Sequence, residues 1–420
     1  PSATPPPATS PASALCAEPS RLEKRKAHQK ASSRRNRKKK KSAQDGYVLE
    51  PQLSKKQLSG SHVVAPAYST ESFGIASTGY VCPRTKNSAT TYSLDQLVGP
   101  HSRFGFRLQE WDAGNPMPIV DDRRRVYGVC AGVPKNDAGW DSLQMRAASL
   151  LEASRPALKF KEKDRKSRRG KFSAINVGIS HGGGQSHPKV LSQDSKNVPI
   201  LEELMADEAF HRISGFSAGA FASWAPRLYR YQSECVTKLI EKDQQLRREG
   251  THPDPNEKEL HRNWPKTPWA SAALNFGPQT VCFKHADYNN LAFGWCSITA
   301  LGSYDYKAGG HLVLWDLKLV IEFPPGSTIL IPSSAIHHSN TRIQVGERRQ
   351  SFTQYSAGGL FRWLENDFKT VTDHRSTLQP EQTASLLDEL SNQLELGLSL
   401  FSTVEELELA RNISISVHSS

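Results

Sequence analysis

The sequence predicts an α+β fold in which a double-stranded β-helix (jelly-roll) core is buttressed by helices and preceded by a disordered basic tail. Three observations support this prediction. Short apolar runs alternate with turn residues such as Pro324-Pro325-Gly326 between residues 269 and 368, as in a barrel of short strands. Several segments before residue 269 have the apolar periodicity of amphipathic helices. The first 75 residues are polar, with many Pro, Ala, Ser, Lys and Arg.

Residues 1–75 are therefore expected to be a disordered tail. Residues 21–41 contain twelve Lys or Arg and one acidic residue, so they carry +11 of the chain's formal net charge of +12. The run Arg34–Lys41 is typical of a nuclear localisation signal or a nucleic-acid-binding arm, and we expect the protein in the nucleus. The alternative is a solvated charge run without a dedicated partner. No apolar run reaches transmembrane length, so no membrane partner is expected.

Residues 76–268 are expected to form an N-terminal extension of one domain that spans residues 76–368. Apolar runs punctuated by Gly and Pro between residues 79 and 132 indicate edge strands. Helical periodicity follows over Trp140–Ser154, Ile200–Ile213 and Ala222–Arg248. We interpret these as helices that pack against the sheet.

A second basic stretch, Arg155–Lys171, lies inside this extension. It contains nine Lys or Arg against two acidic residues and is soon followed by Gly182-Gly183-Gly184. Dense positive charge beside a glycine-rich loop favours contact with a DNA backbone, because phosphate neutralisation dominates such affinity. A solvated charged loop is the alternative. The residues expected to contact phosphates are Lys159, Lys161, Lys163, Arg165, Lys166, Arg168, Arg169 and Lys171.

Residues 269–368 are expected to hold the β-helix core, and residues 369–420 a helical tail. The predicted strands are Ser271–Phe283, Leu291–Leu301, His311–Trp315, Leu317–Phe323, Thr328–Ile331 and Arg348–Ser356. The Leu-rich segment Pro380–Phe401 is predicted to be an amphipathic packing or partner helix.

Two residues between predicted strands suggest a metal site. His285 and Asp287 are two positions apart, which on a strand places both side chains on the same face. A later β-rich run ends in His337-His338. An imidazole pair with one carboxylate is the facial triad of non-heme Fe(II) oxygenases, so we predict that His285, Asp287 and His338 hold Fe(II). A buried, satisfied histidine is the alternative for His338.

The run after the histidines suggests a co-substrate site. Arg349 and Ser351 share a face if residues 348–356 form a strand, and a guanidinium beside a hydroxyl suits the distal carboxylate of 2-oxoglutarate. Pairing His337 with Arg348 would keep the same spacing but would turn Ser351 away from the arginine. We therefore choose His338 with Arg349. A surface ion pair is the alternative role for Arg349.

The block Ala273–Trp363 resembles the TET/JBP family of base-modifying oxygenases, in particular its transposon-associated branch in mushroom-forming fungi. Strong similarity covers about ninety residues and weaker similarity reaches back toward residue 170. The matching pieces are Leu274-Asn275-Phe276-Gly277-Pro278, His285-Ala286-Asp287-Tyr288-Asn289-Asn290-Leu291-Ala292-Phe293-Gly294-Trp295-Cys296, Gly309-Gly310-His311-Leu312-Val313-Leu314-Trp315-Asp316, His338-Ser339-Asn340-Thr341 and Ser351-Phe352-Thr353-Gln354-Tyr355-Ser356-Ala357-Gly358-Gly359-Leu360-Phe361-Arg362-Trp363.

The resemblance implies an Fe(II)- and 2-oxoglutarate-dependent dioxygenase, with dioxygen as co-substrate, that oxidises a methylated base flipped out of double-stranded DNA. It implies that Tyr355 stacks on the flipped base and that Asn290 reads the base edge. The family's cytosine-reading histidine is Ala357 here. This departure extends the expected substrates from 5-methylcytosine to N6-methyladenine.

Two other functions compete with this expectation. One is a 2-oxoglutarate-dependent hydroxylase of protein side chains, and the other is a non-catalytic DNA-binding accessory protein of a transposon. The complete ligand set favours an enzyme, and the basic stretch with Tyr355 and Asn290 favours DNA. A monomer is expected.

Overall fold

Two β-sheets form the centre of the chain. The computed structural model describes residues 51–85 and 88–417, which belong to one compact unit. The larger sheet contains, in spatial order, β3 (Met117–Val120), β4 (Val126–Gly132), β11 (Thr328–Ile331), β8 (Cys296–Ser303), β13 (Arg348–Tyr355), β7 (Ser271–Gly277), β5 (Ser173–Ser180) and β6 (Lys189–Val190), all in antiparallel pairs. The smaller sheet contains β12 (His338–Asn340), β9 (Leu312–Leu314), β10 (Leu319–Ile321) and β2 (Arg107–Gln109). The α+β class is confirmed, and the two-sheet arrangement is consistent with a jelly roll.

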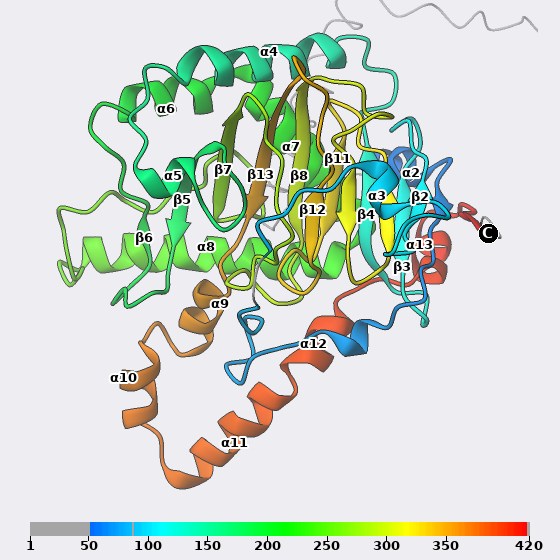
Figure 1. The fold of residues 1–420 in the computed structure, drawn as a ribbon. Coiled ribbons are helices and arrows are strands. Elements are labelled where there is room, and N and C mark those ends of the chain that lie inside the picture. The colour runs from blue at the N-terminus through cyan, green and yellow to red at the C-terminus, as the bar shows by residue number, and fades with distance from the viewer. Residues whose placement is uncertain (1–50, 86–87, 418–420) are drawn as a thin grey trace, which may run out of the picture. The chain divides into compact units, whose positions relative to one another are not determined.

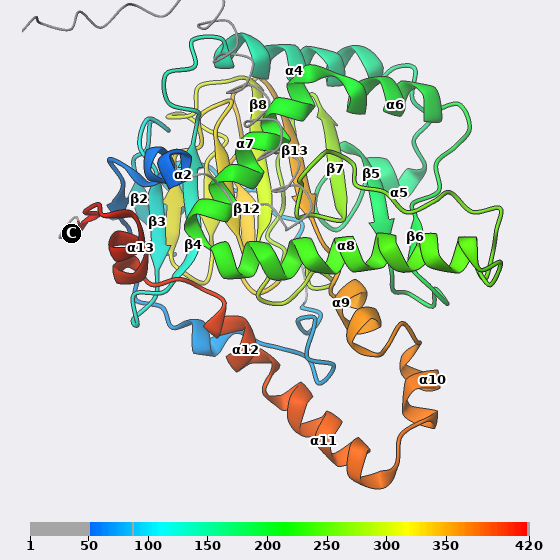
Figure 2. The ribbon, with the colours of Figure 1, turned by 180° about the vertical axis from the view of Figure 1, so that it is seen from behind.

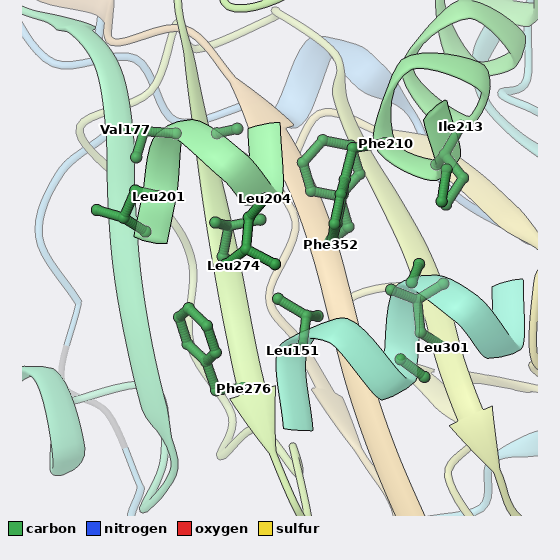
Figure 3. Close-up of a cluster of buried hydrophobic side chains, with 14 of the residues drawn as sticks. Leu151, Val177, Leu201, Leu204, Phe210, Ile213, Leu274, Phe276, Leu301 and Phe352 are labelled. Atoms are coloured by element: carbon green, nitrogen blue, oxygen red, sulfur yellow. The ribbon is translucent and has the colours of Figure 1, made fainter. Parts of the chain in front are cut away.

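Helices cover one face of the larger sheet (Figures 1 and 2). They are α4 (Trp140–Ser154), α6 (Val198–Ala206), α7 (Glu208–Trp224) and α8 (Pro226–Arg248). Alternate residues of the strands, among them Leu274 and Phe352, pack under these helices in one buried cluster (Figure 3). Burial of this face is the main term that holds the helices on the sheet. The predicted buttressing helices are present.

The predicted helix Ile200–Ile213 is two helices, because the chain breaks at Asp207. The backbone of Asp207 is extended, and its carboxylate accepts a hydrogen bond from the Ala209 N–H at 2.9 Å as the N-cap of α7. None of the described helices is both long and apolar enough to cross a membrane.

The opposite face of β13 looks toward the smaller sheet. Gln350, Phe352 and Gln354 face the helices or their connections, so the odd-numbered residues from Arg349 to Tyr355 face inward. The Arg349 guanidinium carbon lies 5.5 Å from the ring centre of Phe323, which follows β10 of the smaller sheet. The shared face predicted for Arg349 and Ser351 is therefore the inner one.

Residues 51–75, part of the segment expected to be disordered, contain regular structure. Residues 51–75 form α2 (Pro51–Leu58), β1 (His62–Val63) and the short 3₁₀ helix η1 (Thr70–Ser72), and Leu58 and Val63 are buried. Apolar residues before residue 75 therefore join the core. The basic segment of residues 21–41 lies outside the described residues.

The C-terminal segment is also not a separate tail. The predicted helix Pro380–Phe401 is interrupted at Asn392, between α11 (Pro380–Ser391) and α12 (Gln393–Ser399). After α13 (Val404–Arg411), the strand β14 (Ser416–Val417) pairs in parallel with β1, which ties the two ends of the described chain together. Helices α10 (Val371–Ser376) and α11 project from the body (Figure 1). The remaining short helices are α3 (Leu94–Leu97), α5 (Glu162–Arg165) and α9 (Gly358–Glu365).

Candidate metal centre

His285 and His338 are brought together by backbone pairing. His285 lies in an irregular segment between β7 and β8, and it forms an antiparallel bridge with His338 of β12. The two residues exchange both backbone hydrogen bonds, at 3.1 and 2.8 Å. The Asp287 N–H donates to the carbonyl of Ser333 at 2.8 Å, which fixes the third residue beside them. The predicted strand across Ser271–Phe283 ends at Gly277, so the bridge, and not a long strand, positions the histidine.

The three side chains converge on one point. Their potential ligand atoms all lie within 4.8 Å of one another. The Nε2 atoms of His285 and His338 lie 3.8 and 3.9 Å from oxygens of Asp287. Each Nδ1–H donates to a main-chain carbonyl, of Phe283 at 2.7 Å and of Ile336 at 3.0 Å, which leaves both Nε2 atoms as acceptors toward the centre. This is the donor set and tautomer that a facial triad needs.

The protonation states of this group also suit a metal. Burial, with the neighbouring His338, lowers the pKa of His285 to about 3, and burial lowers the pKa of His338. Burial raises the pKa of Asp287, but the adjacent histidines and arginines outweigh it and bring the pKa to about 2. At neutral pH the site therefore offers two neutral imidazoles and one carboxylate, the forms that bind metal ions.

The neighbouring His337 points elsewhere. Its backbone N–H and its Nδ1 contact the carboxylate of Asp316, and its Nε2 lies 3.0 Å from the hydroxyl of Thr85. Successive residues of a strand face opposite sides, so only one of the two histidines can join His285. The structure places His338 in the centre, as predicted from the register with Arg349.

Arg349 is buried without a compensating charge. Its side chain is 1 % exposed, and one Nη donates to the carbonyl of Thr280 at 2.6 Å. In residues 51–85 and 88–417 no carboxylate lies within ion-pair distance of it, and its Nε has no hydrogen-bond partner. An unpaired buried charge is costly, so this arginine fits an anionic ligand such as a carboxylate.

Other polar atoms near Arg349 also lack partners. Ser351 accepts a hydrogen bond from Asn275 Nδ2 at 2.9 Å, whereas Asn275 Oδ1 and Thr280 Oγ1 are buried and unpaired within the described chain. Asn275 and Thr280 were missed by the sequence reasoning. Alternation along β7 could have found Asn275, which faces inward between Leu274 and Phe276. Thr280 follows the strand in an irregular loop and gives no such signal. Together these atoms fit the polar co-substrate expected beside Arg349.

The two residues predicted to contact a base lie next to the metal centre. Tyr355 is half-buried on the inner face of β13, and burial raises its pKa to about 12. Asn290 is buried, and its Nδ2 contacts Cys296 Sγ and Ser333 Oγ at 3.3 Å each. Its amide nitrogen is thus used inside the protein. Ala357 forms a backbone bridge with Asn290 and is half-buried.

The basic stretch does not form a single uniform surface. Arg168 turns into the metal centre: it donates to the Ala286 carbonyl at 2.7 Å, lies 3.4 Å from Asp287 and stacks over the Tyr288 ring. Arg169 is half-buried, and Lys159 pairs with Asp194 at 2.7 Å. Arg168, predicted to contact the DNA backbone, therefore also contacts a candidate metal ligand. Arg155 is half-buried and pairs with Glu152 at 2.7 Å. The remaining basic residues of the stretch are exposed: Lys161, Lys163, Arg165, Lys166 and Lys171.

Comparison with known proteins finds distant structural similarities. The chain matches no protein-family model and no curated protein sequence. One similar solved structure is NgTET1 in complex with 5mC DNA, with 13% identity over 61% of this chain and 84% of that chain and a TM-score of 0.41. Another is an oxidoreductase of the 2OG-Fe(II) oxygenase family from Burkholderia pseudomallei, with 15% identity over 50% and 77% and a TM-score of 0.26. The chemistry of the site is derived from its own side chains.

Proposed function

We propose that this protein is an Fe(II)- and 2-oxoglutarate-dependent dioxygenase that oxidises a methylated base in double-stranded DNA. The observation that carries the proposal is the convergence of His285, Asp287 and His338, together with the buried and uncompensated Arg349 on the inner face of β13. The triad fits Fe(II), and the arginine fits a dicarboxylate. Iron and 2-oxoglutarate bound there would use dioxygen to hydroxylate a C–H bond of the base, with 2-oxoglutarate converted to succinate and carbon dioxide.

The residues of the chain have separate tasks in this reaction. His285, Asp287 and His338 would hold the metal, and the Nδ1 contacts of the two histidines fix their imidazole rings. Arg349 receives the distal carboxylate of 2-oxoglutarate, and the Ser351 hydroxyl lies on the same strand face. The burial of these groups keeps water from the reacting atoms.

A base in a duplex must leave the stack to reach this buried centre. Tyr355, half-buried at the end of β13, offers a ring for stacking on the extruded base. Arg169 and the exposed lysines of residues 161–171 place positive charge on the same loop that reaches Asp287 through Arg168. This charge favours DNA over a protein side chain as substrate.

The function is tested with the adjacent histidines as a matched pair. Purified wild-type protein, His338→Ala and His337→Ala are incubated with Fe(II), 2-oxoglutarate and duplexes containing 5-methylcytosine or N6-methyladenine. Mass spectrometry of the nucleosides should show oxidised base with the wild type and with His337→Ala, and a loss of at least about a hundredfold with His338→Ala. If His338→Ala stays active and His337→Ala loses activity, the iron ligand is His337 and the predicted register is wrong by one residue. Succinate formed only in the presence of a protein substrate would favour the hydroxylase of protein side chains.

Base selectivity gives a second prediction. Stacking on Tyr355 discriminates little between bases. Residue 357 is paired with Asn290 through a backbone bridge. With alanine there, we expect 5-methylcytosine oxidation together with detectable N6-methyladenine oxidation. Ala357→His should raise the cytosine-to-adenine ratio about tenfold, as expected for one added hydrogen bond and a narrower pocket. Ala357→Leu controls for bulk because its side chain cannot hydrogen-bond. An equal ratio in all three proteins would remove this position as the determinant.

A further inference from the structure

A small cavity lies where the turn between β5 and β6 meets the region of α9. Its volume is about 110 Å³, and it is lined by Gly182, Gly183 and Gly184 of the turn together with Arg362 and Lys369. Among the described residues that line it, these two are the only charged ones, and none is a carboxylate. The sequence reasoning grouped the glycines with the basic stretch of residues 155–171, but the structure places them beside Arg362.

The turn presents free donors to this cavity. The φ angles of Gly182, Gly183 and Gly184 are 139°, 60° and 90°, in the region that side chains rarely adopt. A Cβ atom on any of them would meet nothing within 4 Å, so close packing is not what requires glycine here. Within the described residues, none of the three N–H groups donates a hydrogen bond to the protein. Successive unpaired N–H groups in a turn form a concavity suited to an anion.

The guanidinium of Arg362 also has no ion-pair partner among the described residues. It is half-buried, and no carboxylate pairs with it in the part of the chain that the structure describes. The nearby Glu365 accepts hydrogen bonds from Tyr231 at 2.7 Å and Gln393 at 3.2 Å instead. Lys369 contacts Asp367 at 3.5 Å, and both side chains are exposed.

A backbone hydrogen bond connects the helix that carries Arg362 to the segment that contains Asp287 and Asn290. Helix α9 starts at Gly358, whose N–H donates to the Asn289 carbonyl at 2.9 Å, next to Asn290. Arg362 follows four residues later, about 6 Å along the helix axis. Both ribbon views place α9 at the end of the larger sheet where β13 finishes (Figures 1 and 2). A DNA strand that delivers a base to Tyr355 would therefore pass near this cavity.

We propose that this cavity binds a phosphodiester group of the DNA strand that carries the target base. Arg362 neutralises the phosphate and the turn of Gly182–Gly184 donates its N–H groups to the phosphate oxygens. The site is distinct from the basic stretch of residues 155–171. It rests on the proposed function for its location, but binding itself requires neither iron nor a methylated base.

The test measures binding of the full chain to a fluorescent, unmethylated duplex without iron, over a range of salt concentrations. Each phosphate contact contributes about 0.9 to the slope of log affinity against log salt. Arg362→Ala should reduce the slope by about this amount, and Arg362→Lys should retain it because the charge remains. Arg248→Ala, which removes an exposed arginine at the end of α8, is the matched control and should leave the slope unchanged.

Two outcomes would overturn the proposal. The first is a salt slope that Arg362→Ala leaves at the wild-type value, or a decrease that Arg248→Ala reproduces. The other is weakened binding of inorganic phosphate in a calorimetric titration with no change in DNA binding, which would make the cavity a site for free anions. Base oxidation is measured separately: a reduced slope in a protein that oxidises no base would retain the DNA site and reject only the proposed activity.

Discussion

Among single residues, Arg349 links the sequence prediction most directly to the chemistry. Its position on the inner face follows from strand alternation with Ser351, which the sequence shows. Its lack of an acidic partner depends on the residues that surround it in space, including Thr280 and Phe323, and strand periodicity contains no information about these contacts. The same limit explains why Arg168 was assigned to the DNA backbone, since its contact with Asp287 joins residues 119 positions apart.

Arg349 is expected to reduce the stability of the ligand-free protein. Replacing a buried, unpaired charge by an apolar side chain of similar length removes a desolvation cost, so Arg349→Met should raise the free energy of unfolding by about 1 kcal/mol. The same variant should lose the stabilisation of about 2.7 kcal/mol that 2-oxoglutarate gives the wild type at a hundred times its dissociation constant. Urea unfolding with Mn²⁺ in place of iron, with and without 2-oxoglutarate, measures both effects.

Arg348→Met is the control for this prediction. Arg348 is the exposed neighbour of Arg349 and pairs with Glu152, so its loss should change stability by less than about 1 kcal/mol and keep the response to 2-oxoglutarate. If Arg349→Met were several kcal/mol less stable and still responded to 2-oxoglutarate, Arg349 would be a structural residue.

At the scale of elements, the sequence predicted the regular structure well where local periodicity is strong. The helix Trp140–Ser154 and the strand Thr328–Ile331 have the predicted bounds, and the strand Arg348–Ser356 ends one residue early. The predictions failed where contacts between residues far apart in the sequence determine whether a segment is ordered. The segments before residue 75 and after residue 369 are polar on average, yet the few apolar residues in them pack together through β1 and β14.

The C-terminal packing gives a testable prediction in α13. Leu407 is 3 % exposed and Leu409 is 88 % exposed on the same helix. Leu407→Ala should lower the free energy of unfolding by about 3 kcal/mol because it removes buried apolar surface and leaves a cavity. Leu409→Ala should change it by less than about 0.5 kcal/mol. Equal, small effects in urea unfolding would mean that residues 369–417 do not unfold together with the sheets.

For the whole molecule, the distribution of charge separates DNA affinity from chemistry. Residues 21–41 carry +11, and the remainder of the chain is nearly neutral overall. The metal centre, Arg349 and Tyr355 all belong to the unit of residues 49–420. Affinity that depends on phosphate neutralisation should therefore come largely from the tail, whereas turnover should depend on the folded unit.

Deletion of residues 1–48 tests this division. The truncated protein should keep its unfolding free energy and its maximal rate of base oxidation, because the deletion removes no residue of the folded unit. Its DNA affinity should fall, and the slope of log affinity against log salt should drop by several units, at about 0.9 for each lost phosphate contact. A full-length variant with the basic residues of Arg34–Lys41 replaced by Gln controls for chain length.

If the salt slope is unchanged in both proteins, residues 1–48 do not contact DNA. The basic run would then be only a nuclear localisation signal read by an import receptor. The decrease caused by Arg362→Ala should persist in the truncated protein, since that contact belongs to the folded unit.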